Sequence, residues 1–304
     1  MIPTVIGIDL GTTTITALAV DTRTWEITAS HTVPAPRLDA PPGRSESDAD
    51  AIVAAGLGLL GRLPPGAGVG ITGQQHGVLV VDDDQRPLTP LIGWQDKRAD
   101  GVVLERARSL VGDTAARTGC RLSNGYGAVT LFALKEEGRL PRGRACTLMD
   151  YFASSLHGTP PVTDPTCAAS LGCFDVVRGG WDDEILRALG LPREMFPEVR
   201  PTRTHLGDNQ ASFLGSVTAP DATVLVNVGT GGQVSAYSAD FRIADAIEAR
   251  SFPGGGYLLV SAGLCGGASL VALSALFLSP LPPALRPALR GERAGGWGRS
   301  AASR

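Results

Sequence analysis

The stretch DLGTTT places a carboxylate, a glycine and three threonines where a metal ion and a phosphate group could bind. Asp9 ends an apolar run and is followed by Gly11, Thr12 and Thr13. A carboxylate in this position can hold Mg²⁺ directly or through water, and the neighbouring backbone N–H groups and hydroxyls can hold phosphate oxygens. An ordinary hairpin with an aspartate in its turn would have the same sequence, so this stretch alone leaves both interpretations open.

The stretch NVGTGG at residues 227–232 repeats the glycine-threonine arrangement without the aspartate. Gly229 and Thr230 could therefore form a second phosphate clamp. Apolar residues flank both stretches, so residues 4–20 and 222–237 each predict a strand, a Gly/Thr turn and a second strand. Two such hairpins from two domains could face one ligand.

The elements around these turns predict an α/β domain whose sheet begins with antiparallel strands. A third strand is expected over residues 26–35, a helix over 48–63, and a strand, a turn and a strand over 66–88. Strands and helices in this order favour the α/β class. Further helices, most of them closed by a glycine, are expected over residues 100–112, 127–138, 146–158 and 182–191.

Composition is ordinary for a soluble globular protein. The chain has 304 residues, 43% of them apolar, and a net charge of −3. This charge gives no reason to expect nucleic acid or an anionic membrane as a partner. No apolar run reaches the roughly 18 residues that a membrane span needs, and the five cysteines form no C-x-x-C pair. We therefore expect reduced thiols and a cytoplasmic location.

Seven stretches, taken in order, resemble the FGGY family of carbohydrate kinases, and within it most of all the sedoheptulokinase and xylulokinase branch. The resemblance implies the actin-like ATPase fold, which is related to ribonuclease H, and it extends over most of residues 5–237. Each stretch alone is a weak signal, whereas seven in the family's order are specific. They are GIDLGTTT, GITGQQHG, WQDKR, TGCRLSNGYGAVTLFALK, MDYFASSLHG, GDNQAS and NVGTGG.

The resemblance implies that Asp208 in GDNQ is the catalytic base. A base at this position takes the proton from the primary hydroxyl of the sugar as that oxygen attacks the γ-phosphate of ATP. The positions that match sugar-contacting residues are Gln75, His76, Asp96 and Asn209. Sugars need several fixed hydrogen-bond partners, and side chains of these types in turns after apolar strands supply them. His76 could instead be an ordinary turn residue.

The resemblance also implies ATP and Mg²⁺ as cofactors. Asp9 matches the carboxylate that organises Mg²⁺, directly or through water. The first phosphate loop of the family is matched by Gly11, Thr12 and Thr13, and the second by Gly229 and Thr230.

Three other features have simpler interpretations. Trp94 in WQDKR could equally be a core residue or a platform for a sugar. The acidic run Asp82–Asp84 is expected to be a solvated hairpin turn rather than a metal site. Cys167 and Cys173 are expected to be small buried side chains.

The chain departs from the family in length. FGGY kinases have two domains of comparable size, and this chain stops at residue 304. We expect a complete or nearly complete sugar-binding and catalytic domain over residues 1–217 and an incomplete nucleotide-side domain over 218–280. A tail rich in Pro, Arg and Gly over 281–304 is expected to be disordered. An uncovered face between the domains predicts poor solubility or self-association as a homo-oligomer.

A second departure lies next to Asp208. Only RPTRTHL, residues 200–206, separates the PEV stretch from GDN. These residues include one aliphatic side chain, Leu206, and an average strand has about 5–6 residues, so their composition argues against a buried strand. Catalytic groups must be held to within about 0.5 Å of productive geometry. The sequence therefore predicts that Asp208 is present while its support is in doubt.

These observations predict an ATP-dependent kinase that phosphorylates a ketose such as sedoheptulose or xylulose, with a small-molecule sugar and ATP as its partners. Two alternatives remain open. A catalytically impaired remnant would at most bind sugar, and the segments missing from the second domain favour it. A non-metabolic actin-like ATPase, such as a filament or chaperone ATPase, is disfavoured because GQQHG, WQDKR and GDNQAS match the sugar side.

Overall fold

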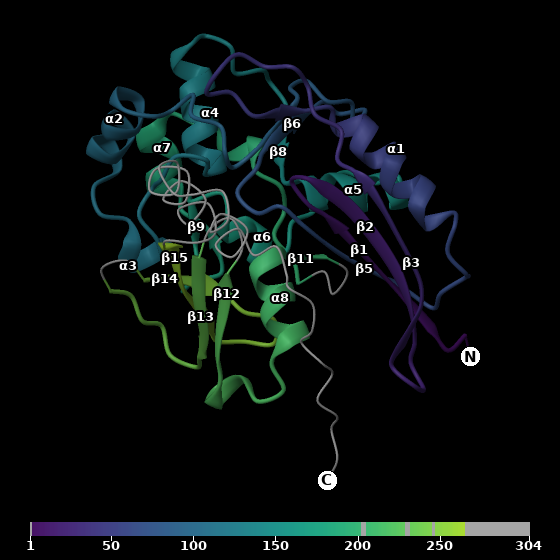
Figure 1. Cartoon of the computed structure of the whole chain (residues 1–304). Helices are drawn as coiled ribbons and strands as arrows, with labels where there is room; N and C mark the ends of the chain where they lie inside the picture. Colours follow the sequence, from purple (N-terminus) through teal and green to yellow (C-terminus); the bar gives the residue numbers. More distant parts are fainter. Residues whose placement is uncertain (1, 202–204, 229–231, 245–246, 265–304) are drawn as a thin grey trace, which may run out of the picture. The chain divides into compact units, whose positions relative to one another are not determined.

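A computed structural model gives the fold of the chain (Figure 1). It is a mixed α/β fold with a central sheet, which confirms the predicted class. The predicted second phosphate turn, with Gly229 and Thr230, and the predicted tail 281–304 lie outside the described residues. The structure describes residues 2–201, 205–228, 232–244 and 247–264.

Contacts within the chain divide it into two units. The first unit is Met1–Leu225 together with Ser235–Val260, and it contains all the predicted site residues except Gly229 and Thr230. The second unit is Val226–Val234 together with Ser261–Arg304. Each unit is described by itself.

The central sheet has five strands, in the order β11 (His205–Gly207), β5 (Val69–Gly73), β1 (Thr4–Leu10), β2 (Thr14–Asp21) and β3 (Glu26–Pro34). The antiparallel pairing of β1, β2 and β3 confirms the predicted hairpin and third strand. β5 runs parallel to β1, and β11 runs parallel to β5. The carboxyl ends of β1, β5 and β11 therefore meet at one edge of the sheet.

Two helices pack against this sheet, α1 (Ala49–Leu60) and α5 (Leu148–His157), as Figure 1 shows. Ile6, Ile8 and Leu10 alternate along β1 and are buried in the same core as the helices. They share one face because successive side chains of a strand point to opposite sides. The packing in this core fixes the position of β1 in the central sheet.

All the helices that the sequence predicted are present. α1 begins where predicted because the Asp48 carboxylate accepts the Ala51 N–H at 2.9 Å and caps its first turn. α2 (Val102–Val111), α4 (Gly127–Glu136) and α7 (Asp183–Leu189) contribute to a second core. The other helical segments are α3 (Ala115–Thr118), α6 (Pro165–Ala169), α8 (Asp208–Ser216), η1 (Arg193–Met195) and η2 (Pro220–Ala222).

A second sheet has the order β12 (Val224–Val228), β13 (Gly232–Ser238), β15 (Tyr257–Leu264) and β14 (Glu248–Ser251). Phe213 of α8 packs with Leu258 and Val260 of β15 in a small third core. Short pairs of strands complete the described fold. They are β4 (Glu46–Ser47) with β7 (Leu91–Ile92), β6 (Leu79–Val81) with β8 (Arg144–Cys146), and β9 (Phe174–Asp175) with β10 (Gly180–Trp181).

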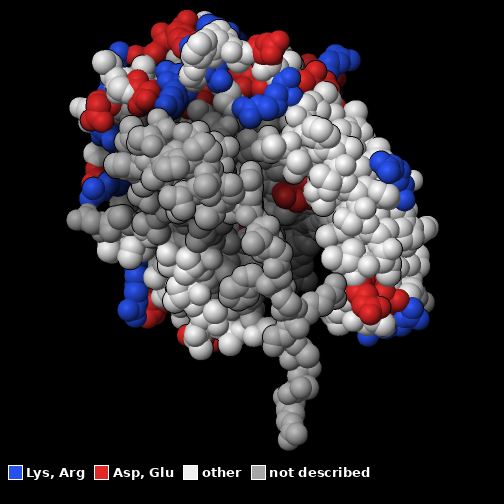
Figure 2. Space-filling view, viewed as in Figure 1, with Lys and Arg blue, Asp and Glu red and all other residues white. Residues whose placement is uncertain are grey.

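The surface carries charges of both signs. On the face that Figure 2 shows, acidic and basic side chains mix near α2 and α4, whereas most side chains over β2 and β3 are uncharged. Asp83 and Asp84 lie in an exposed turn, as predicted. No helix within the described ranges is long and apolar enough to cross a membrane. The cysteines in these ranges are free and buried, which agrees with the expected reduced thiols: Cys120, Cys146, Cys167 and Cys173.

Candidate active site

Three of the predicted site segments meet at the carboxyl edge of the central sheet. Asp9 lies near the end of β1, Gln75 follows β5, and Asp208 and Asn209 open α8 directly after β11. β5 is the middle strand of these three, so the segments lie side by side. Ligands of open α/β sheets bind outside the carboxyl ends of the strands. The sheet topology therefore brings these side chains to a place suited to ligand binding.

The strand before Asp208 forms, so the expectation that this stretch would not make a buried strand is wrong for His205–Gly207. β11 pairs with β5 along its three residues. Thr72 Oγ1 donates to the Leu206 carbonyl at 3.1 Å. The Gly207 N–H donates to Thr166 Oγ1 at 3.1 Å. A short strand can be buried when its backbone N–H and C=O groups find such partners.

Asp208 has a carboxylate oxygen, Oδ1, that is buried without a hydrogen-bond partner among the described residues. Burial raises the pKa of Asp208 to about 6, and the negative charge of Asp9 adds to the rise. Arg250 and the backbone N–H groups of Asn209 and Gln75 oppose it. A carboxylate with an unused oxygen and a pKa near neutrality is suited to accept a proton.

His76 lies in a strained turn that its neighbours hold in place. Its φ is 70°, in the left-handed region that residues other than glycine rarely occupy. Its Nδ1–H donates to the Ser170 carbonyl at 3.0 Å, and its ring centroid lies 4.3 Å from that of Tyr126. Burial and the charge of Arg250 lower the pKa of His76 to about 3. The ring is therefore neutral, and a contact between His76 and a sugar stays a prediction.

A buried arginine, Arg250 of β14, lies beside Gln75 and was not predicted from the sequence. Its Nη1 donates to Gln75 Oε1 at 3.2 Å, and its Nη2 donates to Glu248 Oε2 at 2.9 Å. The Tyr126 hydroxyl donates to the other carboxylate oxygen of Glu248 at 2.5 Å. Arg250 thereby orients the Gln75 amide and places a positive charge near Asp208.

The turn after β1 carries the first predicted phosphate loop. Asp9 is exposed, yet the surrounding protein desolvates its carboxylate enough to raise its pKa. A Cβ on Gly11 would lie 2.8 Å from the Thr14 carbonyl oxygen and 3.6 Å from Asp9 Oδ2, so a side chain would crowd this turn. Thr12 Oγ1 accepts a hydrogen bond from Trp94 Nε1 at 3.0 Å. Trp94 is 46% exposed, which removes the interpretation as a core residue.

Asp96 differs from the other predicted sugar residues because protein groups already engage its carboxylate. Its Oδ1 accepts Arg98 Nε–H at 2.7 Å, and its Oδ2 accepts the Ser45 N–H at 2.8 Å. Arg98 also donates to Glu46 Oε1 at 2.6 Å. Both oxygens of Asp96 thus have protein partners, whereas Asp208 Oδ1 has none among the described residues. A role for Asp96 toward sugar hydroxyls remains a prediction.

The sequence of the chain is similar to those of known proteins. The sequence model described as "FGGY family of carbohydrate kinases, N-terminal domain" matches residues 4–237. A glycerol kinase from Thermus brockianus is 36% identical over 158 residues, which cover 49% of this chain and 32% of the relative. An apulose kinase from Pectobacterium atrosepticum is 32% identical over 243 residues, which cover 71% of this chain and 47% of the relative. The chain thus spans less than half the length of these curated relatives.

A solved structure supports the fold assignment. The xylulose kinase from Rhodospirillum rubrum superposes with a TM-score of 0.83 at 23% identity, over 94% of this chain and 66% of that one. At this identity the likeness concerns the fold alone. The central sheet is therefore part of a fold that this chain shares with a sugar kinase.

Proposed function

The chain belongs to the FGGY family of carbohydrate kinases, and from this premise we propose that it transfers the γ-phosphoryl group of ATP to a primary hydroxyl of a ketose. The observation that supports this most strongly is the buried, unpartnered Oδ1 of Asp208 at the carboxyl edge of the sheet. We also propose a cytoplasmic location, which the buried free thiols of the described cysteines support.

In this proposal Asp208 accepts the proton of the attacking hydroxyl. A general base of this kind contributes roughly 10²–10⁴-fold to the rate. The remaining work of phosphoryl transfer is positioning and charge neutralisation. Gln75, His76 and Asn209 position the sugar, and Asp96 would add a further hydroxyl contact if its present partners released it.

The residues at the end of β1 fit a Mg²⁺ ion and the phosphates of ATP. Asp9 is an exposed residue with a carboxylate, the ligand type that Mg²⁺ prefers. Its charge also raises the pKa of Asp208, so a cation beside Asp9 would relieve repulsion between two carboxylates. When bound, Mg²⁺ neutralises negative charge on the phosphates. In this turn Gly11, Thr12 and Thr13 would hold phosphate oxygens. For Gly229 and Thr230, which lie outside the described residues, a phosphate-binding role stays a prediction from the resemblance.

The charges around the site favour a neutral sugar over an anionic one. The carboxylates of Asp9, Asp208 and Glu248 gather there against the guanidinium of Arg250. An additional carboxylate or phosphate on the substrate would be repelled. Xylulose and sedoheptulose are neutral ketoses, and their selection would agree with the resemblance to the sedoheptulokinase and xylulokinase branch.

The proposal is tested by the release of ADP from Mg-ATP in the presence of xylulose, sedoheptulose, glycerol or gluconate. We expect release that depends on a ketose, lower release with gluconate, and loss of both in Asp208→Ala. A wild-type protein that matches Asp208→Ala on every sugar would contradict the proposal. Sugars that stabilise the protein thermally without turnover would instead support a binding function.

Replacing Gly207 with alanine is expected to weaken sugar binding. Its Cβ would lie 2.8 Å from Gln210 Oε1 and 2.8 Å from Gln75 Nε2. Both glutamines are buried, so Gln75 has little room to yield. We expect the Kd for the best ketose, measured by calorimetry, to rise roughly tenfold. Gly215→Ala is the matched control, because its Cβ would meet nothing within 4 Å; equal Kd values for the two variants would contradict the assignment of Gln75.

A further inference from the structure

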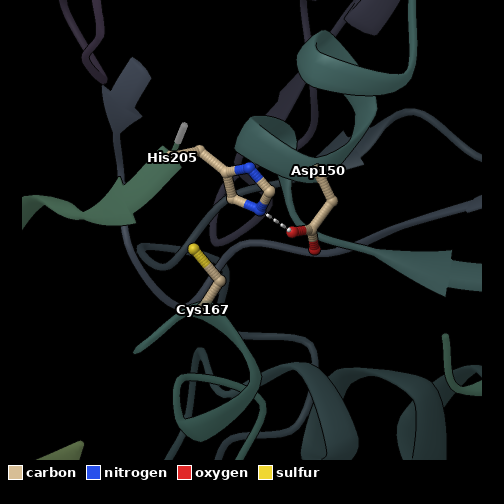
Figure 3. A group of neighbouring side chains, drawn as sticks. All are labelled: Asp150, Cys167 and His205. Carbon is tan, nitrogen blue, oxygen red and sulfur yellow. Dashed lines mark hydrogen bonds and ion pairs between the residues drawn. The ribbon is translucent and has the colours of Figure 1, made fainter. Parts of the chain in front are cut away.

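Three buried side chains that the proposed reaction does not use meet beside β11: Asp150 of α5, Cys167 of α6 and His205 of β11 (Figure 3). His205 Nε2 donates to Asp150 Oδ1 at 2.9 Å, and both side chains are at most 2% exposed. Asp150 Oδ2 accepts the Thr147 N–H at 2.8 Å and so caps the first turn of α5. Figure 3 shows the imidazole ring and the carboxylate facing each other.

The chemistry of this group argues against a metal site. The ligand atoms of its three members lie within 4.8 Å of one another, whereas a structural zinc ion takes four ligands. Both carboxylate oxygens of Asp150 already accept hydrogen bonds from the protein. Burial raises the pKa of Cys167 well above its usual range, and a protonated thiol is a poor metal ligand.

The pair instead connects α5 to the strand that delivers Asp208. His205 is the first of the three residues of β11, and Asp208 follows the last of them. α5 is rooted in the core of the central sheet, where Met149 and Phe152 are fully buried. The hydrogen bond between His205 and Asp150 therefore joins this short strand to a rigid element.

We propose that His205 and Asp150 are positioning residues that hold β11, and through it the Asp208 carboxylate, at the carboxyl edge of the sheet. Backbone pairing over only three residues holds β11 weakly. The buried hydrogen bond from His205 to Asp150 adds a second connection, to a helix that is packed in the core. The precision matters because a displacement of about 1 Å at a reacting group can cost roughly 10²-fold in rate. The proposal rests on the proposed role of Asp208 as the base.

Hydrogen exchange tests the anchorage without relying on turnover. In His205→Leu we expect the backbone amides of residues 205–209 to exchange roughly tenfold faster than in the wild type, because a buried hydrogen bond is lost. His205→Gln keeps an N–H donor at a similar reach and is expected to recover most of the protection. Asp48→Ala is the matched control, because it removes the cap of α1 and destabilises the fold away from β11.

Turnover provides the second readout. For His205→Leu we expect kcat with the best ketose to fall roughly 10²-fold while KM changes less than about twofold, and Asp48→Ala to keep both values. If His205→Leu and Asp48→Ala accelerate exchange equally across the whole domain, the pair is merely structural and the proposal is wrong. Metal analysis of the purified wild type is expected to find none at the pair; one equivalent that His205→Leu loses would also overturn it. A wild type without turnover would contradict the proposed function but leave the exchange result decisive for the anchorage.

Discussion

The variant Asp208→Asn is expected to lose nearly all turnover and, at the same time, to fold more stably than the wild type. Turnover falls by roughly 10²–10⁴-fold because asparagine cannot accept the proton of the sugar hydroxyl. Stability rises because the wild-type carboxylate is charged at neutral pH in a place where burial disfavours that charge. Asparagine has the shape of the protonated carboxyl group without its titration.

The pH dependence of this stability gain follows from the direction of the pKa shift. The pKa of Asp208 is about 6 in the folded protein and has an ordinary value of 3.8. Between these values the unfolded chain ionises first, so the folded state is penalised increasingly as the pH rises through this window. Above about pH 6 the full difference applies, at most roughly 3 kcal/mol. Below the ordinary value of 3.8 both states are protonated and the gain disappears.

Chemical denaturation of the two proteins at several pH values measures this effect. Asp83→Asn is the matched control, because Asp83 lies in an exposed turn and its substitution should change the free energy of unfolding by less than about 0.5 kcal/mol. A stability gain for Asp208→Asn that is the same at acid and at neutral pH would show that the buried charge of Asp208 is not its cause. A loss of stability at neutral pH would do the same.

The variant Arg250→Met is expected to have the second large effect, on stability and on the pH profile. It removes the buried guanidinium that pairs with Glu248 and bonds to Gln75. Breaking a buried ion pair by removing one partner costs about 3–5 kcal/mol, because the other charge remains without compensation. Arg250 also holds the pKa of Asp208 down. Its loss should therefore move the acid limb of sugar-dependent turnover to higher pH.

Two further variants separate these effects. Arg250→Met combined with Glu248→Gln should recover part of the lost stability, because no unpaired charge is left. Arg106→Met is the matched control: Arg106 is 62% exposed in its ion pair with Glu136, and such pairs contribute about 0–1 kcal/mol. A pH profile of Arg250→Met that coincides with the wild-type profile would contradict the electrostatic role of Arg250 toward Asp208.

The sequence predicted the elements whose patterns are local. The hairpin over residues 4–20 and the helices after it follow from apolar periodicity. The resemblance implies roles for both Gln75 and Asp208 in the kinase reaction, and the parallel register of β5 and β11 brings their segments to the same edge of the sheet.

The strand β11 could not be predicted from its own residues. Its stretch is polar and short, and its stability comes from hydrogen bonds to Thr72, Thr166 and Asp150, whose bonded partners in the strand lie 41 to 134 residues away in the chain. Arg250 was missed for a related reason. A lone arginine in a short strand usually faces solvent, and its burial depends on Glu248 and Gln75, which no local pattern connects to it.

The proposed kinase reaction is tested most directly by the rate at which sugar phosphate forms, followed by phosphorus NMR with Mg-ATP and the ketose that binds best. We expect steady formation by the wild type at about pH 8, above the pKa of Asp208. For Asp208→Asn we expect a rate roughly 10²–10⁴-fold lower, with a Kd for the sugar that stays within a few-fold of the wild-type value. Equal rates for the two proteins would contradict Asp208 as the base, and no sugar phosphate from the wild type with any ketose would contradict the kinase itself.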